Sequence, residues 1–108
     1  MSQQPIETYR HVPSDTIEAV WEQVAEATAH WGHECDSGDG WWMITTNEQP
    51  PTTHVLRREQ IAGAILKTLD TYPRTDAAQA LRDGAHQVDH EAADVVAQVA
   101  VFGDIVYG

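Results

Sequence analysis

A chain of 108 residues, 42% hydrophobic and 21% charged, has the size and composition of one small globular domain. Its formal net charge of −11, from 17 acidic residues against 6 lysines and arginines, repels nucleic acids and anionic membranes. With no long apolar run and no secretory signal pattern at its start, the chain is expected to be cytoplasmic, without membrane contact and with direct nucleic-acid binding disfavoured.

The first thirteen residues are predicted to be an irregular N-terminal lead-in, and residues 14–108 to form the single globular domain. Pro5 and Pro13 bracket this lead-in, and a proline has no backbone N–H to donate to a helix or a sheet.

A first helix is predicted from Ser14 or Asp15 to Trp31. Asp15 followed by Glu18 resembles a capping box at its start, and Gly32 is typical of the residue after a helix end. Mostly apolar residues recur at spacings of three and four and so share one face: Ile17, Val20, Trp21, Val24, Thr28 and Trp31. Three acids, Glu18, Glu22 and Glu26, recur at a spacing of four on another side, so this stripe is either solvated or faces a basic partner.

A turn-rich connection is predicted over residues 33–40, because Asp36 to Gly40 contains only turn-forming residues. Aromatic and β-branched residues then predict a strand over 41–46, and a second strand over 52–57 follows a proline-containing break. We expect these two strands to form an antiparallel hairpin. Adjacent strand residues point to opposite faces, so one of Trp41 and Trp42 is expected to be buried and the other to lie outside.

The second half of the chain is predicted to be mostly helical, with helices over 58–69, from Thr75–Asp76 to Arg82, and over 85–101. The apolar face of the last helix comprises Val88, Ala92, Val95, Val96 and Val99. The tail after Phe102 is apolar and is expected to pack, as a third short strand beside the hairpin. The fold class is therefore α+β and mostly helical, with about four helices and one two-stranded antiparallel hairpin.

Histidines and the single cysteine form the strongest metal-like pattern. His30, His33 and Cys35 lie close together, and imidazole and thiolate are the ligands that zinc prefers. His86 and His90 are four apart, the spacing of a two-histidine helical site, and His54 would complete either group. The alternative is that these histidines are solvated or cap helices. Cys35 cannot form an internal disulfide, and its acidic neighbours disfavour a reactive thiolate.

No phosphate-binding loop, dinucleotide fingerprint or serine-nucleophile motif occurs in the chain. We therefore predict a small, acidic, non-enzymatic interaction module that requires no cofactor and binds a partner protein or a second copy of itself. The candidate interaction residues are Trp41, Trp42, Glu18, Glu22 and Glu26. The alternative hypothesis is a zinc-type metal-binding domain that uses His30, His33, Cys35 and a further histidine.

Overall fold

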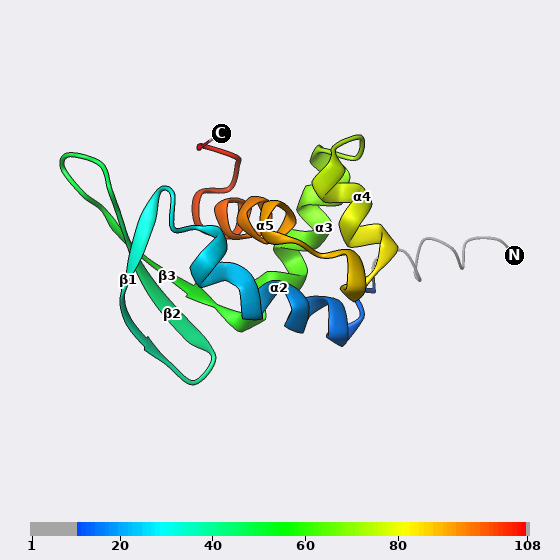
Figure 1. The fold of residues 1–108 in the computed structure, drawn as a ribbon, viewed down its shortest axis with the longest axis horizontal. Coiled ribbons are helices and arrows are strands. Elements are labelled where there is room, and N and C mark those ends of the chain that lie inside the picture. The colour runs from blue at the N-terminus through cyan, green and yellow to red at the C-terminus, as the bar shows by residue number, and fades with distance from the viewer. Residues whose placement is uncertain (1–10, 108) are drawn as a thin grey trace, which may run out of the picture.

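The computed structural model describes residues 11–107, which form four α-helices and a three-stranded antiparallel sheet. The sheet lies at one end of the molecule and α4 (Asp76–Asp83) at the other, with α5 (His90–Phe102) between them (Figure 1). The predicted α+β class is confirmed at this level. Most of the predicted lead-in, residues 1–10, lies outside the described part, and residues 11–13 have no regular secondary structure.

The first helix, α2 (Ser14–Ala27), ends earlier than the sequence predicts. The buried Thr28 hydroxyl donates to the carbonyl of Val24 at 2.8 Å, and the chain turns immediately afterwards. Gly32 is not the end of a helix but the first residue of a strand. A Cβ atom at Gly32 would lie 2.7 Å from Cδ1 of Ile44, so glycine is needed here for close packing of the two strands. At the other end of α2, Pro13 is the N-cap and makes no side-chain cap hydrogen bond, so the predicted capping box is wrong.

The sheet consists of β1 (Gly32–Gly38), β2 (Trp41–Thr46) and β3 (Thr53–Arg57), in that order. The predicted hairpin of β2 with β3 is confirmed. The predicted turn over 33–40 is wrong, because only Asp39 and Gly40 turn and the residues before them pair with β2. Gly40 has a φ of 78°, which glycine adopts without steric cost.

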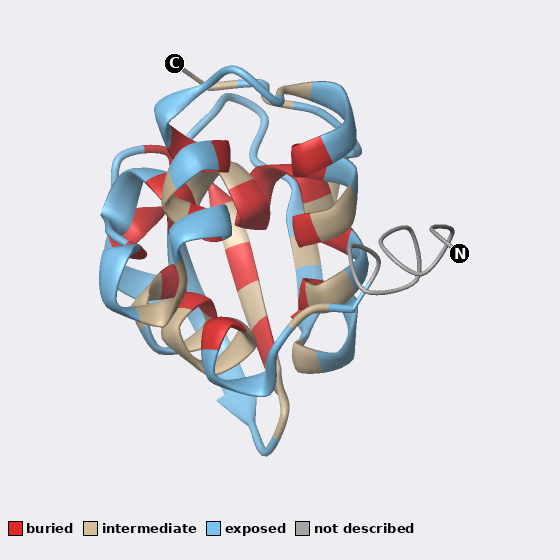
Figure 2. Ribbon diagram, turned by 90° about the vertical axis from the view of Figure 1, so that its right-hand side faces the viewer, coloured by how far each residue is buried: buried red, intermediate tan, exposed pale blue. Residues whose placement is uncertain are grey.

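The inner face of the sheet packs on the helices. Residues of β2 alternate between buried and half-buried, as the strand through the centre of Figure 2 shows, and Trp42, Ile44 and Thr46 point inward. Leu56 of β3 joins them. Helix α5 contacts every other helix and β3, and its small buried residues let these elements approach closely: Ala92, Ala93, Val96 and Ala97.

The helices of the second half lie close to their predicted positions, but the first and the last of them begin later than predicted. A short 3₁₀ turn, Arg58–Gln60, precedes α3 (Ile61–Thr71), and Thr75 caps α4 by accepting a hydrogen bond from the amide of Ala78. The last helix, α5, begins at His90 rather than at residue 85, because the Asp89 carboxylate accepts a hydrogen bond from the Ala92 amide at 2.9 Å. A separate 3₁₀ turn, Ala85–Gln87, lies before it.

The C-terminal tail packs on the body, as predicted, but it is not a strand. The third strand of the sheet is β1, and residues 103–107 follow an irregular path beside α5 (Figure 1). The backbone amides of the tail are paired with the fully buried Gln98 side chain and not with a neighbouring strand. Oε1 of Gln98 accepts hydrogen bonds from the amides of Val106 and Tyr107 at 2.8 and 2.7 Å. The Tyr107 ring stacks on Trp31, with ring centroids 5.3 Å apart.

The docking of the tail is predicted to depend on pH at the alkaline end. A hydrogen bond to Glu48, together with desolvation and the charge of that carboxylate, raises the pKa of Tyr107 above its ordinary value of 10.0. The folded state therefore holds this proton more tightly than the unfolded chain does. The resulting stabilisation is fully present below about pH 10 and is lost as the pH rises through the higher pKa of the folded protein.

NMR titration of ring-labelled tyrosine measures this shift directly, and Glu48→Gln should return the pKa of Tyr107 toward 10.0. An unchanged titration curve in that variant would show that Glu48 does not hold the hydroxyl proton.

Candidate functional site

A groove of about 200 Å³ lies between α2 and the β1–β2 hairpin, and we call it the aromatic groove. Trp21, Val24 and Ala25 line it from α2. Ser37, Gly38, Trp41 and Trp42 line it from the hairpin. Segments that are distant in the sequence therefore bring three tryptophans to one surface depression, and such a placement is typical of interaction sites.

The tryptophans of the groove differ in exposure. Trp42 points inward and is 4% exposed, whereas Trp41 and Trp21 are half-buried. This is the alternation that the strand period predicts for the adjacent pair. Trp21 packs beside the core, as its position on the helix predicts, but it also faces the groove. Trp41 and Trp21 therefore supply the accessible aromatic surface, and Trp42 forms the buried base.

Gly38 sets the position of Trp41. The two residues are paired across the hairpin, and a Cβ atom on Gly38 would lie 2.3 Å from Nε1 of Trp41. The indole thus lies directly against the glycine backbone, where any side chain would displace it.

Replacing Gly38 with alanine is expected to push the Trp41 indole out of the groove and to destabilise the fold by about 1–3 kcal/mol. Tryptophan fluorescence and denaturant unfolding would measure the two effects. Gly63→Ala is the matched control, because Gly63 is an exposed residue of α3 with open space around its Cβ position. That variant should be stabilised by about 0.5–1 kcal/mol, since alanine favours helix. Equal behaviour of the two variants would contradict the contact.

A carboxylate is held beside the groove. Oε1 of Glu34 accepts a hydrogen bond from Nε1 of Trp42 at 2.9 Å, and its Oε2 accepts one from the Ser37 hydroxyl at 3.1 Å. Two donors on two oxygens fix the orientation of this exposed side chain. Each oxygen keeps lone-pair capacity for a further donor. Sequence reasoning missed Glu34, because its role depends on the register that pairs it with Ile44.

The acidic stripe of α2 is partly engaged. Glu18 forms an ion pair with Arg58, which follows β3 and whose amide donates to Gly40 at the tip of the β1–β2 hairpin. Glu26 lies 3.3 Å from Nε2 of His90, and both side chains are largely exposed. Glu22 is exposed and, within residues 11–107, has no ion-pair partner. The stripe therefore contains the Glu18–Arg58 ion pair, which connects α2 to the segment hydrogen-bonded to the hairpin tip, and the exposed acid Glu22, which follows Trp21 in the chain.

The histidines and the cysteine lie apart. His30 binds Asp94 at 2.8 Å, His33 lies 3.3 Å from the side chain of Asn47, and His54 contacts Thr52 and the ring of Phe102. His86 lies in the 3₁₀ turn before α5, so it does not share a helix with His90. Cys35 is exposed at a bulge of β1, where the Thr45 hydroxyl donates to its sulfur at 3.3 Å. Across residues 11–107, no three metal-ligating side chains converge.

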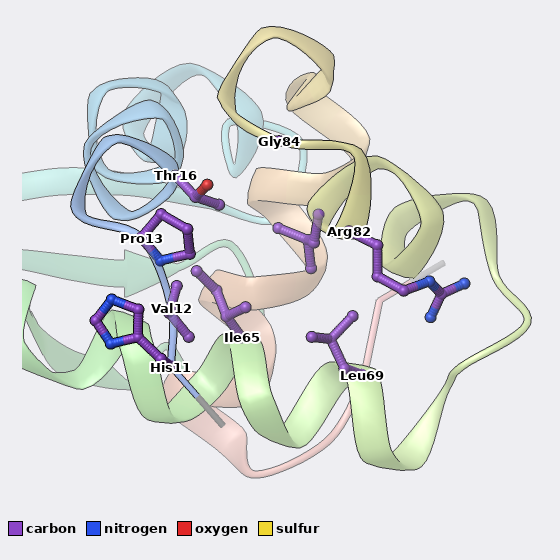
Figure 3. A pocket seen from close by; sticks show the side chains of 9 residues that line it. His11, Val12, Pro13, Thr16, Ile65, Leu69, Arg82 and Gly84 are labelled. Carbon is purple, nitrogen blue, oxygen red and sulfur yellow. The ribbon is translucent and has the colours of Figure 1, made fainter. Parts of the chain in front are cut away.

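A larger cavity of about 310 Å³ lies at the helical end of the molecule (Figure 3). Its walls come from the start of α2, from α3 and from α4 and are mostly apolar: His11, Val12, Pro13, Thr16, Ile65, Leu69, Leu81, Arg82 and Gly84. The Arg82 guanidinium points away from Ile65 and donates to the carbonyl of Pro73 and to the side chain of Gln79. The Arg82 guanidinium is therefore engaged outside the cavity, and the polar side chains that remain in the lining are His11 and Thr16. The aromatic groove, with its tryptophans and the oriented Glu34 beside it, is the better-developed candidate.

No protein-family model, no curated protein and no solved structure matches this chain. None of the helices in the described part is long and apolar enough to cross a membrane.

Proposed function

We propose that this protein is a non-enzymatic interaction module that binds a segment of a partner protein in the aromatic groove. The observation that carries the proposal is the convergence of two half-buried tryptophans, Trp21 and Trp41, from separate elements on one depression. Tryptophan is enriched among the residues that contribute most to binding at interfaces, because it buries a large rigid surface with few rotatable bonds.

Charge favours a basic partner over a second copy of the chain. Two copies that each carry a net charge of −11 repel one another, whereas a basic segment is attracted and its association is accelerated. Glu34, which is hydrogen-bonded to two lining residues, carries part of this charge beside the groove, and Glu22 follows the lining residue Trp21 in the chain. The exposed free thiol of Cys35 suits the reducing cytoplasm, which is where we place the interaction. We do not extend the proposal to zinc, because no observation on the histidines favours it.

Selection of a displayed library of random short peptides on the immobilised protein tests this proposal. Selected peptides should perturb NMR signals of α2 and of the β1–β2 hairpin. Their affinity for Trp41→Ala should fall by roughly tenfold or more, which corresponds to about 1.4 kcal/mol or more for the loss of one aromatic anchor.

Val55→Ala is the control for this experiment, because Val55 is exposed on the outer face of β3 and does not line the groove. Circular dichroism would verify that both variants are folded. Peptides that bind wild type and Trp41→Ala equally, or that map to another surface, would overturn the proposal.

A further inference from the structure

The aromatic groove has the chemistry of a site for one guanidinium group. Its volume of about 200 Å³ accommodates a long side chain rather than a helix of the partner. The half-buried residues Trp21 and Trp41 line the groove from α2 and from the β1–β2 hairpin, so aromatic side chains border it on two sides. A planar cation is attracted electrostatically to such a surface, and guanidinium also stacks on it.

Glu34 supplies the matching anion. Its carboxylate is oriented by the Trp42 indole N–H and by the Ser37 hydroxyl, and both of those residues line the groove. Each oxygen has one hydrogen bond and can accept another, so the group can receive the two parallel N–H donors of a guanidinium. A lysine ammonium binds as a point charge and uses neither the planar stacking nor the paired acceptors.

We propose that the groove binds an arginine side chain of the partner segment, stacked on Trp41 and paired with the Glu34 carboxylate. This inference rests on the proposed function, and it specifies the group that is recognised there. Neither Glu22 nor Glu34 lines the groove itself, and both are exposed. Of the two, Glu34 is oriented by hydrogen bonds from the lining residues Trp42 and Ser37, whereas Glu22 contributes long-range attraction.

The test uses blocked amino acids, so it does not depend on a peptide having been selected. N-acetyl-arginine methylamide, titrated into the protein, should shift the indole N–H signals of Trp21 and Trp41 saturably. The citrulline analogue has nearly the same shape but no charge, and the lysine analogue keeps the charge without the planar group. Both should bind at least about tenfold more weakly.

Variants of the protein locate the interaction. Glu34→Gln keeps an acceptor for the Trp42 indole but removes the charge, and it should weaken binding of the arginine probe about tenfold or more. Glu91→Gln, at an exposed acid in the first turn of α5, is the matched control and should leave binding unchanged. Circular dichroism and the indole signals of the free variants would confirm that the groove is intact.

The outcomes separate this inference from the proposed function. Equal binding of the arginine and citrulline probes, equal binding of the lysine probe, or an unchanged affinity in Glu34→Gln would each overturn the arginine site. If selected peptides still bind in a Trp41-dependent manner and tolerate replacement of arginine by citrulline, the interaction module stands and only its proposed ligand is wrong. If the arginine probe binds in the groove but the library yields no binding peptide, the proposed interaction module is wrong and the groove is a site for a small cation.

Discussion

Replacing Trp31 with alanine is expected to lower the free energy of unfolding by about 3–5 kcal/mol. Trp31 is 2% exposed, and its indole N–H donates to Oδ1 of Asp94 at 2.7 Å. Its ring stacks on Tyr107 and meets Phe102 at a tilt, with centroids 5.3 Å away in each case. Truncation would therefore leave a cavity at the junction of α2, α5 and the C-terminal tail and would remove one partner of a partly buried carboxylate.

Urea unfolding followed by circular dichroism measures this loss of stability. Two further variants show whether it comes from the buried indole of Trp31. Trp31→Phe keeps most of the buried ring and removes the N–H, so it should cost less than the alanine variant. Trp21→Ala removes a half-buried indole at the aromatic groove and should also cost less. An equal loss for Trp31→Ala and Trp21→Ala would contradict the assignment of Trp31 to the core and Trp21 to the groove.

Replacing Gln98 with alanine is expected to destabilise the protein by about 2–4 kcal/mol and to release the C-terminal tail. Gln98 is fully buried, and its amide makes four hydrogen bonds. Its Oε1 accepts from the amides of Val106 and Tyr107, and its Nε2 donates to the carbonyl of Tyr107 and to Asp94. Without this side chain, backbone groups of the tail lose their partners, and each buried group left unsatisfied costs about 1–3 kcal/mol.

Amide hydrogen exchange at Val106 and Tyr107, combined with denaturant unfolding, tests this prediction. Gln79→Ala is the control, because Gln79 is an exposed glutamine of α4 whose side chain bonds only to its helix neighbours Asp83 and Arg82. That variant should change stability by no more than about 0.5 kcal/mol. Gln98→Leu would refute the role of the amide if it matched the wild type in both stability and exchange.

Sequence patterns predicted the elements that have one buried face. The β2–β3 hairpin, α4 with its Thr75 cap, and the mostly buried apolar face of the last helix all carry strong local signals. The edge strand β1 was missed because all of its residues after Gly32 are exposed, so no alternation of polar and apolar residues marks it. The boundaries of α2 and α5 were also wrong. Helix α2 ends at Ala27, and α5 begins at His90 after the Asp89 cap, although both positions lie inside apparently continuous helical patterns.

The candidate site was predicted only in part. The adjacent pair Trp41 and Trp42 was identified from the strand period alone, and the acids of α2 from their spacing. Glu34, Gly38 and the groove-facing role of Trp21 were not found. The first two act through contacts across the hairpin, and the third depends on α2 and the hairpin bordering the same groove. The spacing of the histidines suggested a cluster that is not formed among the described residues.

The sequence by itself determined the net charge, the α+β class and the difference in burial between Trp41 and Trp42, because composition and local periodicity are properties of short stretches of chain. Only the tertiary structure decided that Gly32–Gly38 is a strand, that Gln98 holds the tail and that Trp21 lines one groove together with the hairpin. Each of these depends on partners distant in the sequence. Such contacts stabilise the protein only when strands pair and helices pack, and a local sequence pattern does not predict which distant residues will then be in contact.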